Sequence, residues 1–256
     1  MNFIRLEDTQ STSSYLASIA RDCPHATVVT ARSQTAGRGQ RGNSWEAAPG
    51  MNITMSLLLR PEGIAPSRQF VISQAVSMGI VNVLRRYLPG HKVSVKWPND
   101  IYVGDGKICG ILIENVITSK SILHSIAGVG INVNQREFFS DAPNPVSMMQ
   151  LMGHEFDVEC LTGEFARGIL SEVDAACSAV MSDDSAAVSE LSDRYFNTLW
   201  RSDAYYPYMD NLRGERIEAC IVSVAPDGII TLSIRSIGSP VEELRSYAFK
   251  EITALL

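Results

Sequence analysis

Two lysines, an asparagine and an aspartate fall within twelve positions of the sequence, and their chemistry suits a nucleotide phosphate with its metal ion. Lys96, Asn99, Asp100 and Lys107 lie between apolar segments that have the pattern of strands. Pro98 biases the preceding residue away from helix, so a strand should end there and the polar side chains should occupy its exit. Asp100 could hold Mg²⁺, because phosphate-bound magnesium usually takes about one or two carboxylates. The alternative is a polar surface turn with Lys–Asp pairing.

A glycine-rich basic loop lies upstream at residues 37–42, and Trp45 follows it. Glycines let a backbone approach a ligand closely, and Arg38 and Arg41 add donors suited to phosphate or carboxylate. The loop matches neither the Walker phosphate loop nor the dinucleotide-binding fingerprint. A surface hairpin with solvated arginines would give the same pattern, so both interpretations stay open for the loop alone.

Two weaker patterns could add ligand contacts. Asn132 follows glycine-spaced strand residues and could line a pocket that the backbone approaches closely, although a satisfied asparagine at a tight strand crossing is at least as good an explanation. Ser11, Thr12 and Ser13 precede a helical segment. A helix N-cap explains their hydroxyls fully and is favoured on this pattern alone. A pocket for a carboxylate or ureido group is the alternative.

The elements that must position these residues follow from hydrophobic periodicity. Helical spacing predicts helices over residues 14–20, 66–88, 161–181 and 186–200. Alternating or β-branched runs predict strands over 27–31, 51–60, 92–96, 107–115 and 121–133, and residues 135–150, with Pro143 and Pro145, are typical of a loop. After a composition change near residue 203, short strands are expected at 216–224, 229–234 and 246–249, separated by turns at 226–228 and 238–240. We therefore expect a large domain over 1–203 and a small all-β module, a barrel or sandwich, over 204–256.

Composition excludes several classes of protein. The 256 residues carry a net charge of −6, the wrong sign for a chain whose main partner is nucleic acid. Five scattered cysteines, an odd number, argue against a disulfide framework and a zinc site and fit a reducing compartment. The charged N-terminus is unlike a signal peptide, and no apolar run approaches a membrane span. We expect a cytoplasmic protein without a membrane partner.

Two segments taken together resemble the biotin protein ligases. They are K-W-P-N-D at 96–100, with a second lysine at 107, and G-R-G-x-x-G-x-x-W at 37–45. The similarity extends from about residue 4 to the end of the chain. It implies an α+β fold: a mixed β-sheet flanked by helices, of the class II synthetase-like kind, followed by a small SH3-like β-barrel. It also implies a reaction in which MgATP activates biotin to biotinyl-5′-AMP. The biotinyl group then passes to a lysine of the biotin carboxyl carrier domain of a biotin-dependent carboxylase.

The resemblance also assigns roles by position. It places Lys107, Arg38 and Asp100 in catalysis, with Asp100 as the tentative contact to magnesium. It implies that biotin is bound by Ser11, Thr12, Ser13, Gln34, Arg38, Gly39, Gln40, Lys107 and Gly110. It implies that ATP and the adenylate are bound by Arg38, Arg41, Trp45, Lys96, Asn99, Asp100, Lys107 and Asn132.

The chain departs from the family pattern in two respects. Gln40 and Asn43 stand where bacterial members often carry arginine, which bears on how the adenylate is retained and the loop is ordered. The catalytic region starts almost at Met1, so we expect a monofunctional enzyme without a DNA-binding domain. Related enzymes are monomers or pair through the central sheet, so a homodimer stays open. A lipoate–protein ligase and a non-catalytic sensor of biotin or its adenylate are the alternative functions.

Overall fold

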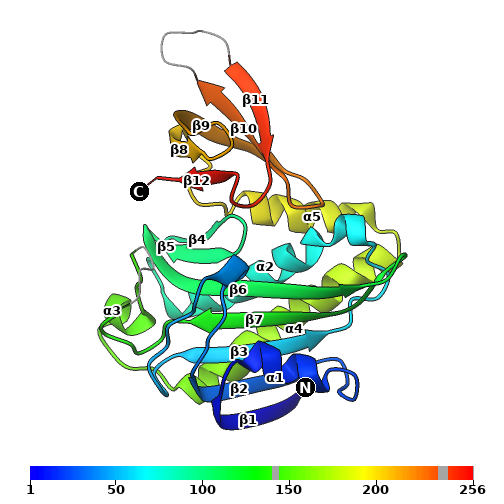
Figure 1. Ribbon diagram of the computed structural model, residues 1–256, viewed down its shortest axis with the longest axis vertical. Coiled ribbons are helices and arrows are strands. Elements are labelled where there is room, and N and C mark those ends of the chain that lie inside the picture. Colours follow the sequence, from blue (N-terminus) through cyan, green and yellow to red (C-terminus); the bar gives the residue numbers. More distant parts are fainter. Residues whose placement is uncertain (140–143, 236–241, 256) are drawn as a thin grey trace.

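The computed structural model describes residues 1–139, 144–235 and 242–255, and it contains two sheets of different size (Figure 1). A mixed sheet flanked by helices makes up the larger part, and an antiparallel sheet formed by C-terminal residues stands on it. The predicted order, a mixed α+β domain followed by a small β module, is therefore confirmed.

Seven strands of the described chain form the larger sheet, in the order β1-β2-β3-β7-β6-β5-β4. They are β1 (Asn2–Thr9), β2 (Thr27–Gln34), β3 (Ile53–Leu59), β4 (Val93–Lys96), β5 (Asp100–Val103), β6 (Gly106–Ile117) and β7 (Ile122–Ile131). β1 and β2 pair in parallel, whereas the other neighbours are antiparallel. β3 is buried along its whole length, as expected for a continuous apolar run with both faces covered.

Helices cover both faces of this sheet. α2 (Phe70–Tyr87), α4 (Val158–Met181) and α5 (Ser185–Phe196) lie on one face, and α1 (Thr12–Ile19) lies on the other (Figure 1). In the described part of the chain, none of the helices has the length and apolar character that crossing a membrane needs.

The core divides between these two faces. Leu57 of β3 packs in the cluster shared with α2 and α4, whereas its neighbour Leu58 packs with Leu16 of α1, because successive side chains of a strand point to opposite faces. Gly79 lets α2 and α4 approach closely, since a Cβ atom there would lie 2.6 Å from the Cα atom of Ile169.

The elements that the sequence predicted are present with small shifts of their ends, except for the strand expected at 246–249, since the strand observed there lies at Glu242–Tyr247 and shares only two residues with it. Some elements escaped prediction. These are β1, β5, β8 (Tyr206–Asp210), β12 (Ile252–Ala254) and the short helix α3 (Met148–Met152), which lies inside the segment expected to be a loop. β1 is a half-exposed edge strand with several charged residues, and β5 and β12 are very short, so none carries a strong hydrophobic pattern. The predicted turn at 238–240 and Pro143 lie outside the described residues.

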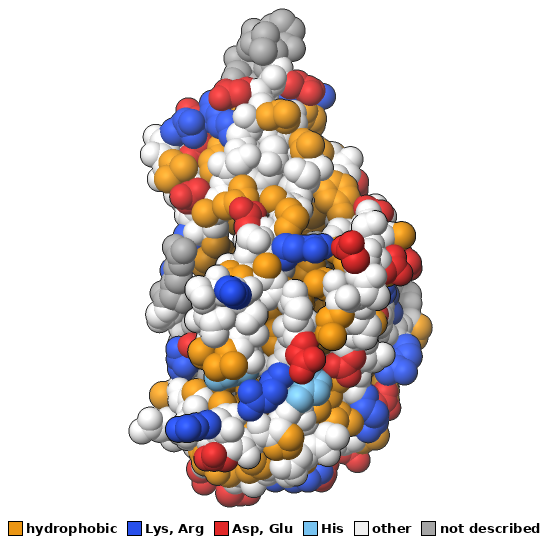
Figure 2. Space-filling view, turned by 90° about the vertical axis from the view of Figure 1, so that its right-hand side faces the viewer, with side chains coloured by type: hydrophobic (Ala, Val, Ile, Leu, Met, Phe, Trp, Pro, Cys, Tyr) orange, Lys and Arg blue, Asp and Glu red, His pale blue; other side chains and the backbone are white. Residues whose placement is uncertain are grey.

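The C-terminal sheet has the strand order β11-β10-β9-β8-β12, in which β9 is Glu215–Val224, β10 is Ile230–Arg235 and β11 is Glu242–Tyr247. Its inner residues, such as Tyr208 and Ile252, belong to the same hydrophobic cluster as the larger domain. The side view shows apolar side chains gathered where the two parts meet (Figure 2). Trp97 joins the parts directly, because its Nε1 donates to the carbonyl of Gly228 at 3.1 Å. The small module is therefore packed against the larger domain.

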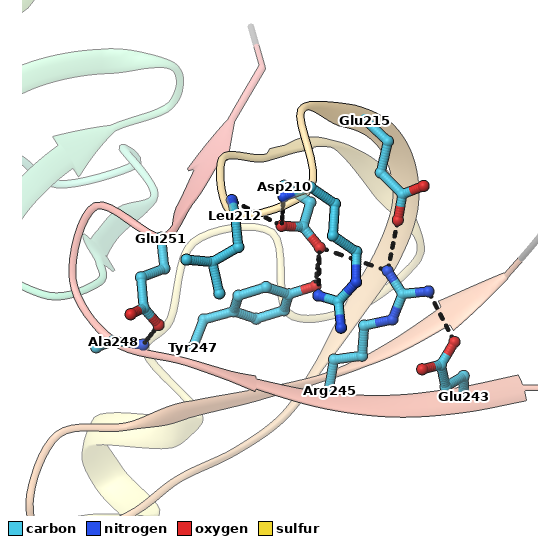
Figure 3. A network of polar contacts seen from close by, with 9 residues as sticks. Asp210, Leu212, Glu215, Glu243, Arg245, Tyr247, Ala248 and Glu251 are labelled. Carbon is cyan, nitrogen blue, oxygen red and sulfur yellow. Dashed lines mark hydrogen bonds and ion pairs between the residues drawn. The ribbon is translucent and has the colours of Figure 1, made fainter.

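A buried carboxylate ties the C-terminal sheet together. Asp210 is fully buried, and Figure 3 shows it at the centre of a polar network. It accepts hydrogen bonds from the Tyr247 hydroxyl at 2.7 Å and from the Arg213 guanidinium at 3.0 Å, and Arg245 lies 3.4 Å away. Burial alone would raise the pKa of Asp210, but the hydrogen bonds from Tyr247 and Arg213 outweigh it and hold the pKa below its ordinary 3.8.

The loop between β2 and β3 returns over the sheet and is held there by Trp45. The ring of Trp45 lies on Gly110 of β6 and Gly130 of β7, which are direct partners in the ladder. A Cβ atom on Gly110 would lie 2.9 Å from the ring, and one on Gly130 would lie 2.7 Å from Cζ2. Glycine is required at both positions because any side chain would displace the indole.

We predict that Asp210→Asn lowers the free energy of unfolding by about 3 kcal/mol at pH 7, because it removes the charge of a buried carboxylate that accepts from Tyr247 and pairs with Arg213 and Arg245. The depressed pKa stabilises the fold above pH 3.8 and this contribution is lost as the pH falls through the folded-state value. The difference between the variant and the native chain in urea unfolding should therefore narrow below pH 3.8. Glu243→Gln, which removes an exposed partner of Arg245, is the control and should leave stability nearly unchanged. Equal stability of Asp210→Asn and native chain at pH 7 would contradict the role given to the network.

We also predict that Gly130→Ala frees the loop at residues 37–45, because the new methyl group collides with Trp45. Overpacking of this kind lowers the free energy of unfolding by about 1–3 kcal/mol. Limited digestion with trypsin should show faster cleavage after Arg38. Gly128→Ala is the matched control on the same strand, since its Cβ would meet no described atom closer than 3.5 Å. If both variants were cleaved at the native rate, Trp45 would not be what holds the loop.

Candidate active site

One cavity of about 320 Å³ lies between the sheet, the start of α1, the loop at 37–45 and the C-terminal module. All but two of the residues predicted from sequence line it: Ser11, Thr12, Ser13, Gln34, Arg38, Gly39, Gln40, Trp45, Lys96, Asn99, Asp100, Lys107 and Gly110. Segments that are far apart in the sequence therefore converge on a single site.

One end of the cavity is neutral and rich in hydrogen-bonding groups. Gln34 Oε1 accepts from the backbone N–H of Thr12 at 2.8 Å, and the hydroxyls of Thr12 and Ser56 lie 2.9 Å apart. Ser11 stands at the N-cap position of α1, but within the described residues its side chain makes no capping bond and lies 2.9 Å from the Ser13 hydroxyl instead. The capping interpretation of these side chains is therefore wrong, because Gln34 takes the place of the cap.

The other end of the cavity is charged. Lys107 Nζ lies 2.8 Å from Asp100 Oδ1, and both side chains are about one-fifth exposed. Strand pairing produces this contact: Asp100 opens β5 opposite Lys96, and β5 pairs with β6, which carries Lys107 near its start. The cis peptide bond between Trp97 and Pro98 lies in the turn between β4 and β5. An ion pair at this depth supplies a positioned ammonium group whose charge is only partly compensated.

Lys96 lies in an aromatic pocket beside this pair. Its Nζ donates to the Tyr102 hydroxyl at 3.0 Å and lies 5.2 Å from the centre of the Trp200 ring. Burial lowers the pKa of Lys96; Asp100 counteracts this effect, whereas Lys107 adds to it. Since burial and a neighbouring cation both disfavour the charged form, an anion bound here would be strongly favoured.

Arg38 lies at the rim of the cavity and is held by a residue that the sequence did not suggest. Its guanidinium donates to both carboxylate oxygens of Glu114 on β6, at 3.0 and 2.7 Å. Both side chains are partly exposed, so this two-pronged pair orients Arg38 more than it stabilises the fold. Seventy-six positions separate the two residues, and no local pattern could have linked them.

Two predicted residues are not part of the cavity as described. Asn132 is buried and its amide donates to the carbonyls of Val146 and Lys107 at 3.2 and 3.4 Å, the arrangement expected of a satisfied structural asparagine. The side chain of Arg41 lies outside the described part of the structure. Asn132 reaches the site only indirectly, through the backbone of Lys107.

The C-terminal module completes the cavity, which the sequence did not predict. Tyr208, Phe249, Lys250 and Ile252 line it, together with Trp200 from the segment that leads into the module. Lys250 has a positive φ of 73°, an uncommon conformation for a residue with a side chain. More than ninety positions separate these residues from Lys107, so the sequence gave no sign of their proximity.

The cavity can hold a metal ion only together with a ligand. Asp100 is the one acidic residue among its described lining residues, and no group of three or more His, Cys, Asp or Glu side chains in the described chain could hold a metal. A single carboxylate does suit a magnesium ion that arrives on phosphate oxygens.

Comparisons with known proteins agree with this geometry. A bifunctional ligase/repressor BirA of Bacillus subtilis is 34% identical over 160 residues, which cover 59% of this chain and 46% of that protein. A biotin–[acetyl-CoA-carboxylase] ligase of Paracoccus denitrificans is 31% identical over 163 residues, covering 60% of this chain and 65% of that protein. The chain thus spans less than two thirds of the length of either relative.

Solved structures share the fold over almost the whole chain. The biotin protein ligase of Aquifex aeolicus in complex with biotin and ATP superimposes with a TM-score of 0.74 at 21% identity, covering 96% of this chain and 99% of that one. The enzyme of Leishmania major in complex with biotin gives a TM-score of 0.60 over 97% of this chain and 99% of that chain. The family model of the biotin/lipoate A/B protein ligases matches residues 5–132, which is half of the sequence. The chain is therefore a member of the biotin/lipoate A/B protein ligase family.

Proposed function

We propose that this protein is an ATP-dependent biotin protein ligase that activates biotin and transfers it to a lysine of a carrier domain. One observation carries the proposal: a single cavity joins a neutral hydrogen-bonding end, around Thr12 and Gln34, to a cationic end, around Lys107 and Lys96. A ligand that is polar but uncharged at one end and carboxylated at the other fits this arrangement. Biotin, with its ureido group and its carboxylate, has that form.

The residues of the cavity suit the first step. In it, a carboxylate oxygen of biotin bonds to the α-phosphorus of ATP, and the bond from that phosphorus to the bridging oxygen breaks to release pyrophosphate. Negative charge crowds at the phosphorus, so positioned cations lower the barrier. Lys107, at the cationic end of the cavity, would supply such a cation, and Lys96 and Arg38 would bind phosphate oxygens.

Magnesium would enter this site with ATP. Asp100 is the carboxylate that would hold it, and the ion would neutralise part of the phosphate charge when bound. Asp100 also pairs with Lys107, so it positions the ammonium group of Lys107 when magnesium is absent as well.

The second step needs a dry site. The ε-amine of the acceptor lysine bonds to the carbonyl carbon of biotinyl-5′-AMP, the bond from that carbon to the phosphate oxygen breaks, AMP leaves with the electron pair, and the surplus proton of the nitrogen passes to water. Because water competes with the amine, the intermediate must be covered. The loop at 37–45, held by Trp45 and by the Arg38–Glu114 pair, is the cover that this chain provides.

The proposal extends to the organisation of the chain. We assign residues 1–203 as the ligase domain and 204–256 as a C-terminal module that closes the cavity with Phe249 and Lys250. The acceptor is the biotin carboxyl carrier domain of a biotin-dependent carboxylase. A homodimer and residence in the cytoplasm stay predictions of the sequence.

Two other functions predict different behaviour. A lipoate–protein ligase would carry out the same two steps on lipoate, but the relative from Paracoccus denitrificans and the two similar solved structures are named as biotin ligases. A sensor would bind biotin or its adenylate without turnover. The positioned Lys107 and Asp100 favour an enzyme, because a sensor needs no activated phosphate.

The deciding experiment is the intact mass of a biotin carboxyl carrier domain incubated with this protein, MgATP and either biotin or lipoate. We expect a mass increase equal to one biotinyl group with biotin alone. Modification by lipoate alone would assign the protein to the other branch of the family. An unchanged mass with both acids would favour the sensor.

We predict that Lys107→Ala slows biotin-dependent exchange of pyrophosphate into ATP by about 10²–10³-fold while the fold stays intact, since it removes a positioned donor from the developing charge. The fold is checked by circular dichroism. Lys120→Ala changes an exposed lysine far from the cavity and is the control, which should exchange at the native rate. Near-native exchange by Lys107→Ala would remove this residue from the mechanism.

A further inference from the structure

A second cavity of about 360 Å³ adjoins the first and has no role in the reaction as derived so far. Both cavities are lined by Gln40, Trp97, Asn99 and Phe249, so the two spaces adjoin at these residues. The far side of the second cavity is formed by the first turns of α2, by β6 and by the turn at 227–229 of the C-terminal module.

Oxygen atoms without partners are concentrated around this second cavity. Ser77 is 1% exposed and lines it, and Ser77 Oγ, Asn115 Oδ1 and Gln40 Oε1 are all buried without a hydrogen-bond partner among the described residues. Buried polar atoms are nearly always paired in folded proteins, because leaving one unpaired costs free energy. Three such oxygens around one cavity indicate that a donor group is bound there at some stage.

The sequence of α2 explains how these oxygens are arranged. Gln69, Ser73 and Ser77 are spaced four apart, which places them on one face of the helix, and all three line the cavity. Gln69 Oε1 in turn accepts from the Asn115 amide at 3.0 Å, which leaves the Asn115 side-chain oxygen without a partner among the described residues. The helix thus presents a polar stripe within an otherwise apolar sequence.

The charge of the second cavity is opposite in character to that of the first. Its described lining contains neither lysine nor arginine, and Asp227 is its one charged residue. A phosphate or carboxylate would therefore prefer the first cavity. A group with N–H donors suits the second, and its apolar walls, which include Phe70 and Trp97, favour the neutral form of an amine over the charged form.

We propose that the second cavity binds the side chain of the acceptor lysine and delivers its amine to the adenylate in the first cavity. The inference rests on the proposed function and goes beyond it by naming the path. The amine would enter between α2 and the C-terminal module and donate hydrogen bonds to Ser77 and Asn115. It would then meet the adenylate beside Gln40, where the two cavities adjoin. Because the amine arrives from the second cavity, it does not enter the phosphate side of the first cavity, where Lys96 and Lys107 lie.

The two half-reactions separate this role from any role in activation. Biotin-dependent pyrophosphate exchange reports adenylate formation, and transfer from isolated biotinyl-5′-AMP to a carrier domain reports the second step. Ser77→Ala should leave exchange at the native rate and reduce kcat/KM for transfer by about fivefold, as for the loss of one hydrogen bond. Ser73→Leu, which fills the cavity, should reduce transfer by about tenfold or more, because a misplaced reacting group reacts slowly.

Each variant has a matched control in the same chain. Ser125 is also fully buried with an unpaired hydroxyl, but it lines neither of the two cavities. Both Ser125→Ala and Ser77→Ala should melt at or above the native temperature. Ser125→Ala should in addition transfer biotin at the native rate. Ser192→Leu on α5 controls for a larger side chain on a half-buried helix position. Hydroxylamine, a small amine that can reach the adenylate through the first cavity, should react at the native rate in every variant.

The outcomes decide the proposal. Normal transfer by both Ser77→Ala and Ser73→Leu would overturn it, and so would a parallel loss of exchange, which would assign the second cavity to the nucleotide. If Ser73→Leu fails to fold, Ser77→Ala alone still tests the inference, because removal of an unpaired hydroxyl should not destabilise the chain. A native protein that shows no biotin-dependent exchange would overturn the proposed function itself, and the inference with it.

Discussion

An excess of positive charge held out of water is the constraint on which the rest of the site depends. Lys107, Lys96 and Arg38 share one cavity in which Asp100 is the one described carboxylate. The pair formed by Asp100 and Lys107 compensates one charge, and Glu114 fixes Arg38 at the rim. Lys96 contacts the Tyr102 hydroxyl and the Trp200 ring, and its ladder partner is Asp100. Charges in such surroundings interact more strongly than in water, so in the proposed reaction the same groups would bind the anionic substrates and stabilise a developing phosphate charge.

The loop at 37–45, which covers the charged end of the cavity, is positioned by the space that two glycines leave for one side chain and not by electrostatic attraction. Gly110 and Gly130 lie opposite each other on β6 and β7, and the space that they leave is filled by Trp45. One contact therefore fixes the position of a loop whose own residues have little to bury. The same contact brings the indole to 5.9 Å from Lys107 Nζ, so the cover and the charged end of the cavity are held by a common residue.

The C-terminal module is part of the site and not an appendage. Its apolar side chains belong to the core of the larger domain, and Trp97, which lies within the charged turn, donates to the backbone of Gly228 in that module. The buried Asp210 network links the strands of the module that forms this wall. Both cavities lie along this junction, so in the proposed reaction the acceptor lysine and the nucleotide would approach the reacting carbon separately.

The sequence by itself determined the type of chemistry and the order of most elements, and nearly all of its candidate residues lie in the first cavity, because these features depend on local patterns. The spacing of Lys96, Asp100 and Lys107 around two short turns is such a pattern, and so is the helical period of α2. Only the tertiary structure decided the contacts between distant segments: Glu114 beside Arg38, the C-terminal wall of the cavity, and the burial of Asn132 as a structural residue. It also replaced the expected serine cap of α1 with a glutamine from β2. The physical reason is that a strand or helix is specified by residues a few positions apart, whereas a site is specified by which elements pack together, and no single segment encodes its neighbours.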